Sequence, residues 1–587
     1  MPISIPMPSL LSALADNERF DVVVIGAGAA GMSAALFAAI DGARVLLVES
    51  TGFVGGSSAL SAGTIWIPGT ALGAGVNPDD SIANAAGFLD RAVGPLSDSS
   101  IRAALLANGA AAVAKAEANS HLKYRARPLH PDYLSELEGS TLCGRALEPL
   151  PFDGRKLGSL LALVRPPIPE FTVLGGMMVD RDDIGHLLEW RRSAASFAYS
   201  TRILLRHAMD RLRHARGTRL LMGNALIGRL LLSLQERGVA LLMRTQVSAL
   251  ERGAAGVAGL TLNQHGQSRR ITASGGVVLA SGGFNRHPLR RAQRLPGIDA
   301  RWCPGAPGHT GAMHDLAEGV GAHYGRTGQS DCFWAPVSIR TRPDSSTAAF
   351  PHFVFDRAKP HMITLDSSGR RFVNESTSYH LFGQAMQAAN KIAPCIPAHL
   401  ITDANGMRKY GLGMVRPGGM GLKSALADGY VTRAETLADL AARLKIDATN
   451  LQHSIERFNA FAETGIDRDF GRGTTAYQRA NGDAAWPGKN PSLGPIGQAP
   501  FYAVQLYPGD IGAATGFATD AAGRALDAGG QPIPGLYACG NDMHSAMGGV
   551  YPAPGITIGP GLVFAYLAAR DAVARARSET ADLARAA

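Results

Sequence analysis

Residues 21–31 read DVVVIGAGAAG, a run of branched apolar residues that leads directly into three closely spaced glycines. The run Val22–Ile25 is typical of a parallel strand that is buried on both faces. The alanine-rich segment that extends to about Ile40 predicts a helix, and Arg44–Glu49 (RVLLVE) predicts a second strand. Residues 20–50 are therefore expected to form a strand, a glycine-rich turn, a helix and a strand.

Each glycine of this turn has its own physical task. Gly26 allows the tight turn, Gly28 lets the backbone approach a pyrophosphate, and Gly31 lets the helix pack closely on the strand. The phosphate would lie at the helix N-terminus beside Ala30, where free N–H groups and the helix dipole favour anions. Glu49 follows Gly31 by 18 residues and ends the second strand, where a carboxylate can bind ribose hydroxyls. This context predicts a dinucleotide-binding domain.

The segments that follow favour FAD, bound non-covalently, over NAD. Gly55–Gly63 (GGSSALSAG) supplies many N–H groups and hydroxyls directly after the second strand, which suits a long cofactor. Far along the chain, Gly555–Gly559 opens a helix whose N-terminus can stabilise negative charge on a reduced flavin. The residues predicted to contact FAD are Gly26, Gly28, Ala30, Gly31, Glu49, Ser50, Gly56, Ser57, Ser58, Ser61, Ala62, Gly63, Val247, Ala280, Ser281, Gly282, Gly540, Asn541, Thr557 and Ile558.

The chain of 587 residues is too long for one compact core, so we expect an α/β protein with more than one domain. We predict a discontinuous Rossmann-like FAD-binding domain formed by residues 1–283 and 500–587, with a helical excursion at about 80–237. Residues 284–499 are more polar and richer in proline, and are predicted to form an inserted α+β catalytic domain.

Charge and cysteine patterns argue against several classes of partner. The net charge is +9, yet no basic run contains interleaved aromatic residues, so we predict no nucleic-acid partner. Arg202–Arg219 is interpreted as a solvated helix face, and weak association with a membrane surface stays open. The five scattered cysteines lack metal-ligand spacing, which predicts no metal site and favours a reducing cytoplasm. No segment has the pattern of a membrane span or of a signal peptide.

Five stretches resemble the 3-ketosteroid dehydrogenases, FAD flavoproteins related to fumarate reductase flavoprotein subunits. The patterns Asn374-Glu375-x3-Tyr379 and Tyr551-x3-Gly555 are the most specific part of this resemblance. The five stretches, spread over nearly the whole chain, are Asp21–Gly31, Glu49–Pro68, Gly276–Phe284, Arg371–Met386 and Gly535–Gly561.

The resemblance implies a Δ1-type desaturation of an apolar ketone such as a 3-ketosteroid. A hydride leaves one carbon for flavin N5, and a proton leaves the carbon next to the ketone. Tyr551 and the amide of Gly555 match the groups that bind the ketone oxygen as an oxyanion hole. Tyr379 matches the tyrosine that takes the proton, and Tyr133, or alternatively Tyr124, matches the tyrosine that relays it. The reduced flavin would pass its electrons to an external acceptor, quinone-like or other.

A tyrosine base presents a difficulty, because a free phenol has a pKa of about 10 and is almost fully protonated at neutral pH. Polarisation of the ketone reduces the basicity that is needed. A nearby positive charge or a helix N-terminus would lower the phenol pKa itself.

Alternative activities follow from the same resemblance. Dehydrogenases of the 4,5 bond of 5α-steroids carry a serine where Ala553 stands, which favours Δ1 here. A desaturase of another cyclic ketone, a reductase of activated alkenes and an electron-carrying flavin subunit stay open. A fumarate reductase-like activity is disfavoured, because the matching loops carry aromatic and apolar residues in place of arginine and histidine. The segment at about 150–226 is a candidate lid, dimer face or membrane-facing patch.

Overall fold

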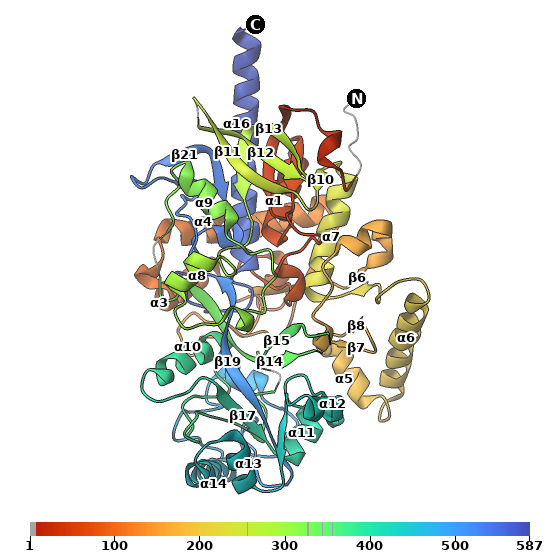
Figure 1. Ribbon diagram of the computed structural model, residues 1–587, viewed down its shortest axis with the longest axis vertical. Helices are drawn as coiled ribbons and strands as arrows, with labels where there is room; N and C mark the ends of the chain where they lie inside the picture. Colours follow the sequence, from red (N-terminus) through yellow and green to blue (C-terminus); the bar gives the residue numbers. More distant parts are fainter. Residues whose placement is uncertain (1–6, 255, 326–327, 343, 355, 587) are drawn as a thin grey trace.

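The structure is a computed structural model that describes residues 7–586, apart from 255, 326–327, 343 and 355. Among these residues, two large sheets lie one above the other along the longest axis of the molecule (Figure 1). The upper sheet contains the N-terminal strand and the lower sheet is built from the middle of the chain. The predicted fold class, α/β with a discontinuous Rossmann-like domain and an inserted second part, is confirmed.

The upper sheet has a parallel layer at its centre. Val22, Val23 and Val24 of its first strand are fully buried, as expected for a strand with helices on both faces. The parallel neighbours are, in order, β10 (Ala240–Leu242), β2 (Val45–Val48), β1 (Glu18–Ile25), β13 (Gln267–Leu279) and β21 (Pro532–Ala538).

One strand is longer than the sequence pattern indicated. We expected separate strands at Arg270–Thr272 and Gly276–Ser281, but both belong to the continuous strand β13. Its first half pairs antiparallel with β12 (Gly256–Gln264), which in turn pairs with β11 (Gln246–Gly253). The strand continues through Gly276 because glycine accepts the φ of +121° found there.

Helices cover the upper sheet, and the first residues of three of them line the cavity: Ala29, Met222 and Ile558. Helix α1 (Ala29–Ile40) is rich in alanine and is buried along most of its length, so it packs tightly on the sheet and against helix α16, which also contacts the sheet. Helix α16 (Ile558–Ala586) is the helix expected to open at Gly555–Gly559, and it projects from the top of the molecule (Figure 1). The helices of this part include α1 (Ala29–Ile40), α3 (Ile82–Ala92), α4 (Ser99–Asn119), α7 (Met222–Glu236) and α16 (Ile558–Ala586).

The lower sheet is antiparallel throughout. Its strands are β15 (Thr347–Pro351), β14 (Cys332–Thr341), β19 (Phe501–Ala513), β17 (Ala398–Thr402) and β16 (Met362–Leu365), with β18 (Thr432–Ala434) beside β19. Its helices include α10 (Tyr379–Asn390), α11 (Ala404–Tyr410), α13 (Leu437–Leu444), α14 (Ala448–Thr464) and α15 (Ala476–Asn481). The long strand β19 begins after the predicted boundary at residue 499, so the lower sheet extends further along the chain than that boundary. The division into domains itself stays a prediction.

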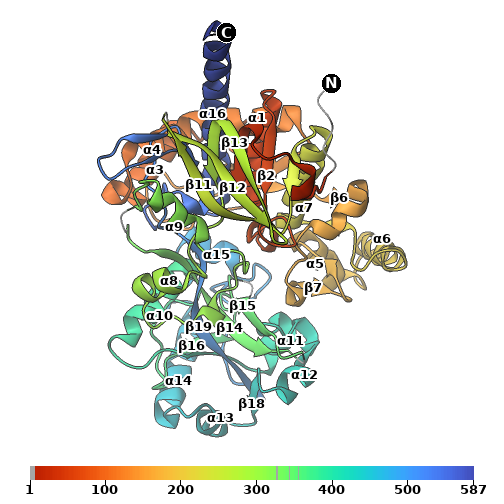
Figure 2. The same ribbon diagram turned by 45° about the horizontal axis from the view of Figure 1, so that its top comes forward.

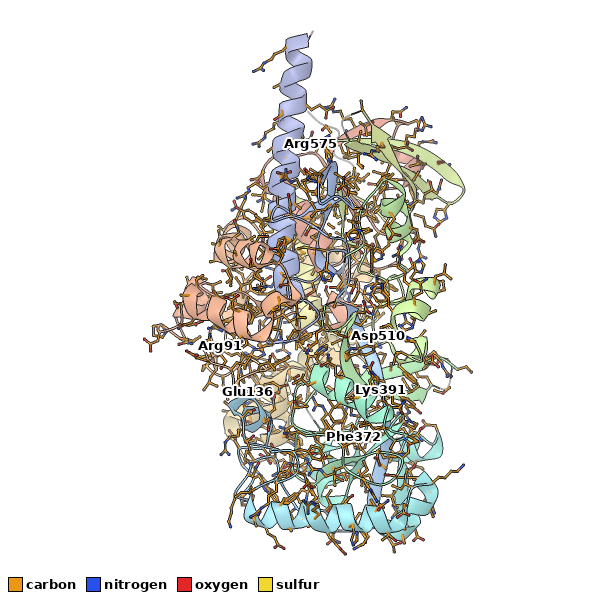
Figure 3. All side chains as sticks on the ribbon, turned by 90° about the vertical axis from the view of Figure 1, so that its left-hand side faces the viewer. Arg91, Glu136, Phe372, Lys391, Asp510 and Arg575 are labelled. Carbon is orange, nitrogen blue, oxygen red and sulfur yellow. The ribbon has the colours of Figure 1, made fainter. Side chains whose placement is uncertain are left out.

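A buried ion pair joins the two parts of the molecule. Arg291 of α8 (Pro288–Arg294) donates from Nη2 to Oδ1 of Asp510 on β19 at 2.8 Å. Asn285, which follows the end of β13, also donates to Asp510 at 2.7 Å. Figure 3 shows Asp510 near mid-height, between the regions of the two sheets. Both ion-pair partners are buried, so this contact links the segment after β13 firmly to the lower sheet.

Two helices of the 150–226 segment project from the side of the molecule. They are α5 (Arg181–Glu189) and α6 (Ala194–Arg211), and both views place α6 at the outer edge (Figures 1 and 2). In the part of the chain that the structure describes, neither these nor other helices combine the length and apolar composition needed to cross a membrane.

Candidate active site

A cavity of about 1700 Å³ lies where the carboxyl ends of the parallel strands face the lower sheet. This is the edge at which α/β sheets bind nucleotides. Every residue predicted to contact FAD lines the cavity, with the exception of Gly31. Since a single drug-sized ligand occupies a pocket of about 300–1,000 Å³, this cavity has room for a large cofactor and a substrate together.

The turn between β1 and α1 fits a pyrophosphate. Gly28 caps the N-terminus of α1, and a Cβ atom built on it would meet nothing within 4 Å, so open space lies over the backbone there. Gly31 acts differently, because its Cβ would lie 1.9 Å from the carbonyl oxygen of Gly26. The missing side chain of Gly31 lets α1 pack on the turn, which is the task that the sequence predicted for it.

Glu49 holds the turn in shape from the end of β2. Its Oε2 accepts a hydrogen bond from the amide of Ala27 at 3.0 Å, and its Oε1 accepts one from Thr51 at 2.8 Å. The carboxylate also lines the cavity, so its remaining lone pairs can accept ribose hydroxyls. Together with the open space at Gly28, these groups fit the nucleotide half of FAD.

His309 lines the same cavity, although the sequence pattern did not identify it as a cofactor residue. Its Nε2 lies 3.4 Å from Oγ of Ser57, and it packs against Gly282. Burial lowers the pKa of His309 to about 4, so the imidazole is neutral at neutral pH. It can therefore act as a hydrogen-bonding group but adds no charge to the site.

Three tyrosines predicted from distant stretches meet on one side of the cavity. The hydroxyls of Tyr133 and Tyr379 lie 3.1 Å apart. The ring of Tyr551 is stacked on that of Tyr133, with 5.7 Å between centroids, and lies 5.1 Å from that of Tyr379. The amide of Tyr133 donates to the carbonyl of Pro552 at 2.7 Å, which connects the loops that carry Tyr133 and Tyr551.

Tyr124, the alternative partner for Tyr379, lies elsewhere. It belongs to β4 (Tyr124–Ala126) and does not line the cavity. Its hydroxyl is buried and has no hydrogen-bond partner among the described residues. The tyrosine that contacts Tyr379 is therefore Tyr133.

A fourth tyrosine, Tyr477, was missed by the sequence analysis. It lies in α15 with its ring centroid 4.8 Å from that of Tyr133, and it also lines the cavity. Its amide donates to Oγ of Ser135 at 3.0 Å. The surrounding sequence, TTAYQR, carries no motif that would have identified it.

Gly555 presents a main-chain amide to the cavity. Its φ is +88°, and a Cβ there would lie 2.7 Å from the amide nitrogen of Trp66, so no other residue fits without displacement. The carbonyl of Gly555 accepts a hydrogen bond from that Trp66 amide at 3.1 Å. No described residue accepts a hydrogen bond from the Gly555 N–H, which leaves this donor available to a ligand.

The protein environment keeps the phenols protonated in the resting site. Burial raises the pKa of Tyr379 and of Tyr133 well above the ordinary value. Burial also raises the pKa of Tyr551, although hydrogen bonding to Tyr379 and Thr557 opposes the shift. A neutral Tyr551 is a suitable donor to a ketone oxygen, whereas a neutral Tyr379 still has to lose its proton before it can act as a base.

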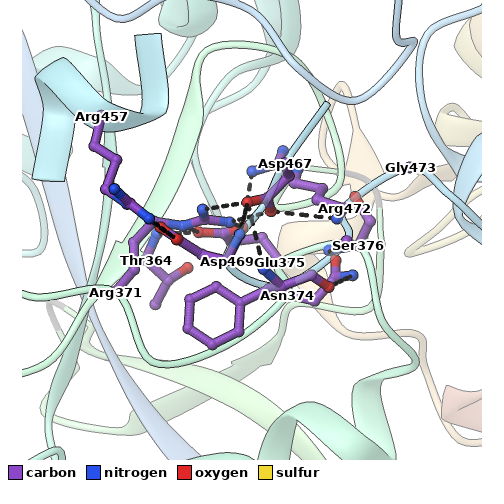
Figure 4. A network of polar contacts seen from close by, with 12 residues as sticks. Thr364, Arg371, Asn374, Glu375, Ser376, Arg457, Asp467, Asp469, Arg472 and Gly473 are labelled. Atoms are coloured by element: carbon purple, nitrogen blue, oxygen red, sulfur yellow. Dashed lines mark hydrogen bonds and ion pairs between the residues drawn. The ribbon is translucent and has the colours of Figure 1, made fainter. Parts of the chain in front are cut away.

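A buried network of charged groups holds the segments that carry Tyr379 and Tyr477 (Figure 4). Glu375 accepts hydrogen bonds from Arg371 at 2.7 Å and from Arg472 at 3.0 Å. Arg371 also pairs with Asp467 at 3.0 Å. The side chain of Asn374 donates to the carbonyl of Phe470 at 3.0 Å. The Asn-Glu-x3-Tyr pattern therefore fixes the start of α10 against the loop before α15.

The comparisons with known proteins agree with this geometry. The family described as FAD binding domain matches residues 21–558. The chain is 35% identical to the 3-oxosteroid 1-dehydrogenase of Mycolicibacterium smegmatis over 95% of this chain and 98% of the relative. The protein belongs to the flavoprotein family of the 3-ketosteroid dehydrogenases. As a member of this family, it is an FAD-dependent oxidoreductase.

Within the 3-ketosteroid dehydrogenase family, two further relatives bear on the substrate. The 4-oxocyclohex-2-ene-1-carboxylate 5-dehydrogenase of Sinomonas cyclohexanicum is 34% identical over 95% of this chain and 94% of its own length. The solved structure of the 3-ketosteroid Δ1-dehydrogenase of Sterolibacterium denitrificans, in complex with 1,4-androstadiene-3,17-dione, matches with a TM-score of 0.88 and 32% identity. That match covers 95% of this chain and 100% of the other. The FAD cofactor is thus shown by the family, while the individual contact residues stay predictions.

Proposed function

We propose that the protein is a 3-ketosteroid Δ1-dehydrogenase. The observation that carries the proposal is the hydroxyl pair of Tyr133 and Tyr379, 3.1 Å apart, beside Tyr551 and the available amide of Gly555. All four groups line the cavity that the predicted FAD residues share. Relatives with 3-oxosteroid 1-dehydrogenase activity in their names, similar over nearly the whole chain, support this choice of reaction.

Each group has one task in the proposed reaction. The Tyr551 hydroxyl and the Gly555 amide donate to the ketone oxygen and stabilise the charge that develops on it as the enolate forms. Tyr379 takes the proton from the carbon next to the ketone, and Tyr133 relays that proton. FAD supplies the hydride acceptor when it is bound. An external acceptor then reoxidises the flavin, and we propose only its class, a quinone or another oxidant.

Similarity favours a second candidate substrate. A relative 34% identical to this chain is named for a 4-oxocyclohexene carboxylate, whose ring ketone could use the same donors and base. A steroid remains our first choice, because several relatives named for 3-oxosteroid substrates are similar over nearly the whole chain and the cavity of about 1700 Å³ has room for a polycyclic substrate beside a cofactor. Phe333 and Phe353 line it and suit a flat apolar skeleton.

Anaerobic bleaching of the flavin tests the reaction and the substrate together. The purified protein is mixed separately with androst-4-ene-3,17-dione, a 5α-3-ketosteroid, 4-oxocyclohexanecarboxylate and succinate. We expect the ketosteroids to bleach the yellow absorbance, succinate to leave it unchanged, and product analysis to find the new double bond at carbons 1 and 2. Bleaching by the cyclohexane acid alone would replace the steroid with the second candidate. Reaction with succinate alone would contradict the proposal.

We further propose that the protein docks on an anionic membrane surface through α5 and α6. Leu205, Met209 and Leu212 are 61%, 64% and 84% exposed, and helical spacing places them on one face. The arginines Arg202 and Arg213 lie on this outer side and complement anionic lipid. Two exposed residues near α5, Leu188 and Trp190, also line the cavity, so the apolar surface continues into it.

Vesicle sedimentation tests this docking. The protein should pellet with vesicles that contain phosphatidylglycerol and remain in solution with phosphatidylcholine vesicles alone. Replacing Leu205, Met209 and Leu212 with serine should abolish pelleting while leaving flavin bleaching by a dissolved ketone intact. Equal pelleting of the variant, or a change of oligomeric state in place of vesicle binding, would reject the lipid surface.

A further inference from the structure

Arg357 is a buried cation without a carboxylate partner. Its side chain is fully buried, and none of the ion pairs between described residues includes it. Its Nε donates to the carbonyl of His352 at 2.9 Å, and its Nη1 donates to the carbonyls of Thr377, at 2.8 Å, and Glu375. Its Nη2 has no hydrogen-bond partner in the described part of the chain.

The arginines around it are arranged differently. Arg371 and Arg472 are also buried, but both pair with Glu375, and Arg371 pairs in addition with Asp467. The carboxylates of Glu375 and Asp467 are therefore already ion-paired. Burial lowers the pKa of Arg357 to about 10, so it stays charged at neutral pH. An unpaired charge in a low-dielectric interior interacts strongly with any charge that forms nearby.

The guanidinium carbon of Arg357 lies 5.0 Å from the centroid of the Phe382 ring, and its charge acts on phenols of the site. Its charge opposes the effect of burial and lowers the pKa of both Tyr133 and Tyr477. Through Glu375 and Thr377 it also holds the backbone directly before Tyr379, the first residue of α10. The titratable and charged groups packed around Arg357 and these phenols are His352, Asp356, Glu375, Arg472, Tyr133, Tyr379, Tyr477 and Tyr551.

The nearest acid is already engaged. Oδ2 of Asp356 accepts from Nδ1 of His352 at 2.6 Å and from the amide of Gly413 at 3.0 Å. Its Oδ1 accepts from the amide of Arg357, not from the guanidinium. The guanidinium therefore packs on the Phe382 ring without a carboxylate partner among the described residues, so its charge is not neutralised and can stabilise negative charge on the tyrosines.

We propose that Arg357 is a positioning residue that stabilises negative charge on the hydrogen-bonded pair Tyr133–Tyr379 and orients the start of α10. The inference rests on the proposed function. Tyr379 is protonated in the resting site, so its own proton first passes through Tyr133 to water. When the α C–H bond breaks, its electron pair becomes part of the enolate, and its proton forms an O–H bond with the ionised Tyr379. The proton then passes through Tyr133 to water, which restores the charge on the pair. Arg357 itself neither gains nor loses a proton.

The pH dependence of flavin reduction tests this role in the holoenzyme. Arg357→Gln removes the charge, Arg357→Met removes it while keeping an apolar stem, and Arg357→Lys retains it. We expect the acid limb of the rate profile to move upward by about one pH unit or more in the Gln and Met variants, with at least a roughly tenfold loss of rate near neutral pH. Arg357→Lys should keep the limb within about half a unit. If only one of the Gln and Met variants folds, that variant alone is enough for this test.

A matched control separates charge from scaffolding. Arg371→Gln removes a neighbouring buried guanidinium that is already paired with two carboxylates. It should lower thermal stability without moving the acid limb. If both uncharged variants at Arg357 lose rate with an unmoved limb, Arg357 is only structural and the proposal is overturned.

A second readout does not depend on the substrate. Ultraviolet difference titration follows the ionisation of tyrosines in the wild type, Arg357→Gln or Arg357→Met, and the same variant with Tyr379→Phe added. We expect loss of the charge to shift part of the titration to higher pH, and Tyr379→Phe to remove that part. An unchanged titration rejects the role of Arg357. Failure of every ketone to bleach the flavin, with the shift present, would reject only the proposed reaction.

Discussion

Tyr379 and Tyr551 are chemically identical side chains with opposite proposed tasks. Both are buried in the same cluster, 5.1 Å apart between ring centroids. Tyr551 needs its proton in order to donate to a ketone, and burial favours that state. Tyr379 lies at a helix N-terminus, which favours negative charge, whereas burial and its hydrogen bond to Tyr133 raise its pKa. Differences in local environment are what separate an acid from a base in one site.

Removal of the Tyr379 hydroxyl is expected to abolish most of the turnover. Tyr379→Phe should reduce the rate of flavin reduction by about 10²–10⁴-fold, the usual loss for a general base, with FAD still bound. Tyr551→Phe should cost about 10²–10³-fold as one oxyanion donor is lost. Tyr124→Phe is the matched control, because its buried hydroxyl lies outside the cavity. A loss for Tyr124 as large as that for Tyr379 would contradict the assignment.

A side chain at Gly555 should displace the oxyanion donor. Gly555→Ala places a Cβ against Trp66 in a backbone conformation with φ of +88°. Gly42→Ala is a suitable control, since Gly42 has a φ of +84° but open space around its Cβ. Both variants should lose about 1 kcal/mol or more of stability from backbone strain. Only Gly555→Ala should raise the ketone KM and lower the rate of flavin reduction, measured by stopped flow.

At the level of elements, the charged network of Figure 4 holds α10 and α15 in place around the tyrosines. Glu375→Gln leaves two buried guanidinium groups without a full partner and is expected to cost about 3–5 kcal/mol of unfolding free energy. Arg457→Gln breaks the surface pair with Asp469 and should cost less than about 1 kcal/mol. Urea titration of both variants measures the difference. Equal costs would show that the network contributes no more than a surface pair.

Sequence patterns correctly predicted the elements that are determined by their own residues. The apolar run of β1 and the glycines before α1 specify a strand and a turn locally, and both lie where expected. Tyr133 and Tyr379 were found because of family patterns, but their 3.1 Å contact depends on folding across 246 positions. Tyr477 and Arg357 had no local signal, because their importance comes only from neighbours distant in sequence. The continuity of β13 was missed because glycine weakens the interior of a strand and often marks a bulge or bend.

At the scale of the whole molecule, several buried histidines make stability depend on pH. Burial lowers the pKa of His130, His309, His380 and His399 to about 4, below the unfolded value of about 6.5. Between these two values the unfolded chain binds more protons than the folded one, so stability is lost as the pH falls from about 6.5 toward 4. Each histidine contributes at most roughly 3 kcal/mol.

Thermal unfolding at about pH 7 and about pH 5 measures this effect. His380→Gln should have a smaller difference between the two melting temperatures than the wild type, because one buried site no longer takes up a proton on unfolding. His453→Gln, which changes an exposed histidine, should keep the wild-type difference. A pH dependence that is unchanged in His380→Gln would argue against a neutral buried imidazole at that position.

The Arg291–Asp510 pair lies where the chain leaves the upper part and where β19 returns toward it. Hinged two-domain enzymes usually open at a joint made of small, solvated contacts. Here the joint contains an ion pair in which Asp510 is fully buried and the Arg291 side chain is only 8% exposed, so separating the two parts would leave a buried charge without its partner. The two halves should therefore behave as one cooperative block. A substrate would then enter beside α5, where the exposed residues Leu188 and Trp190 line the cavity, because the two sheets do not move apart.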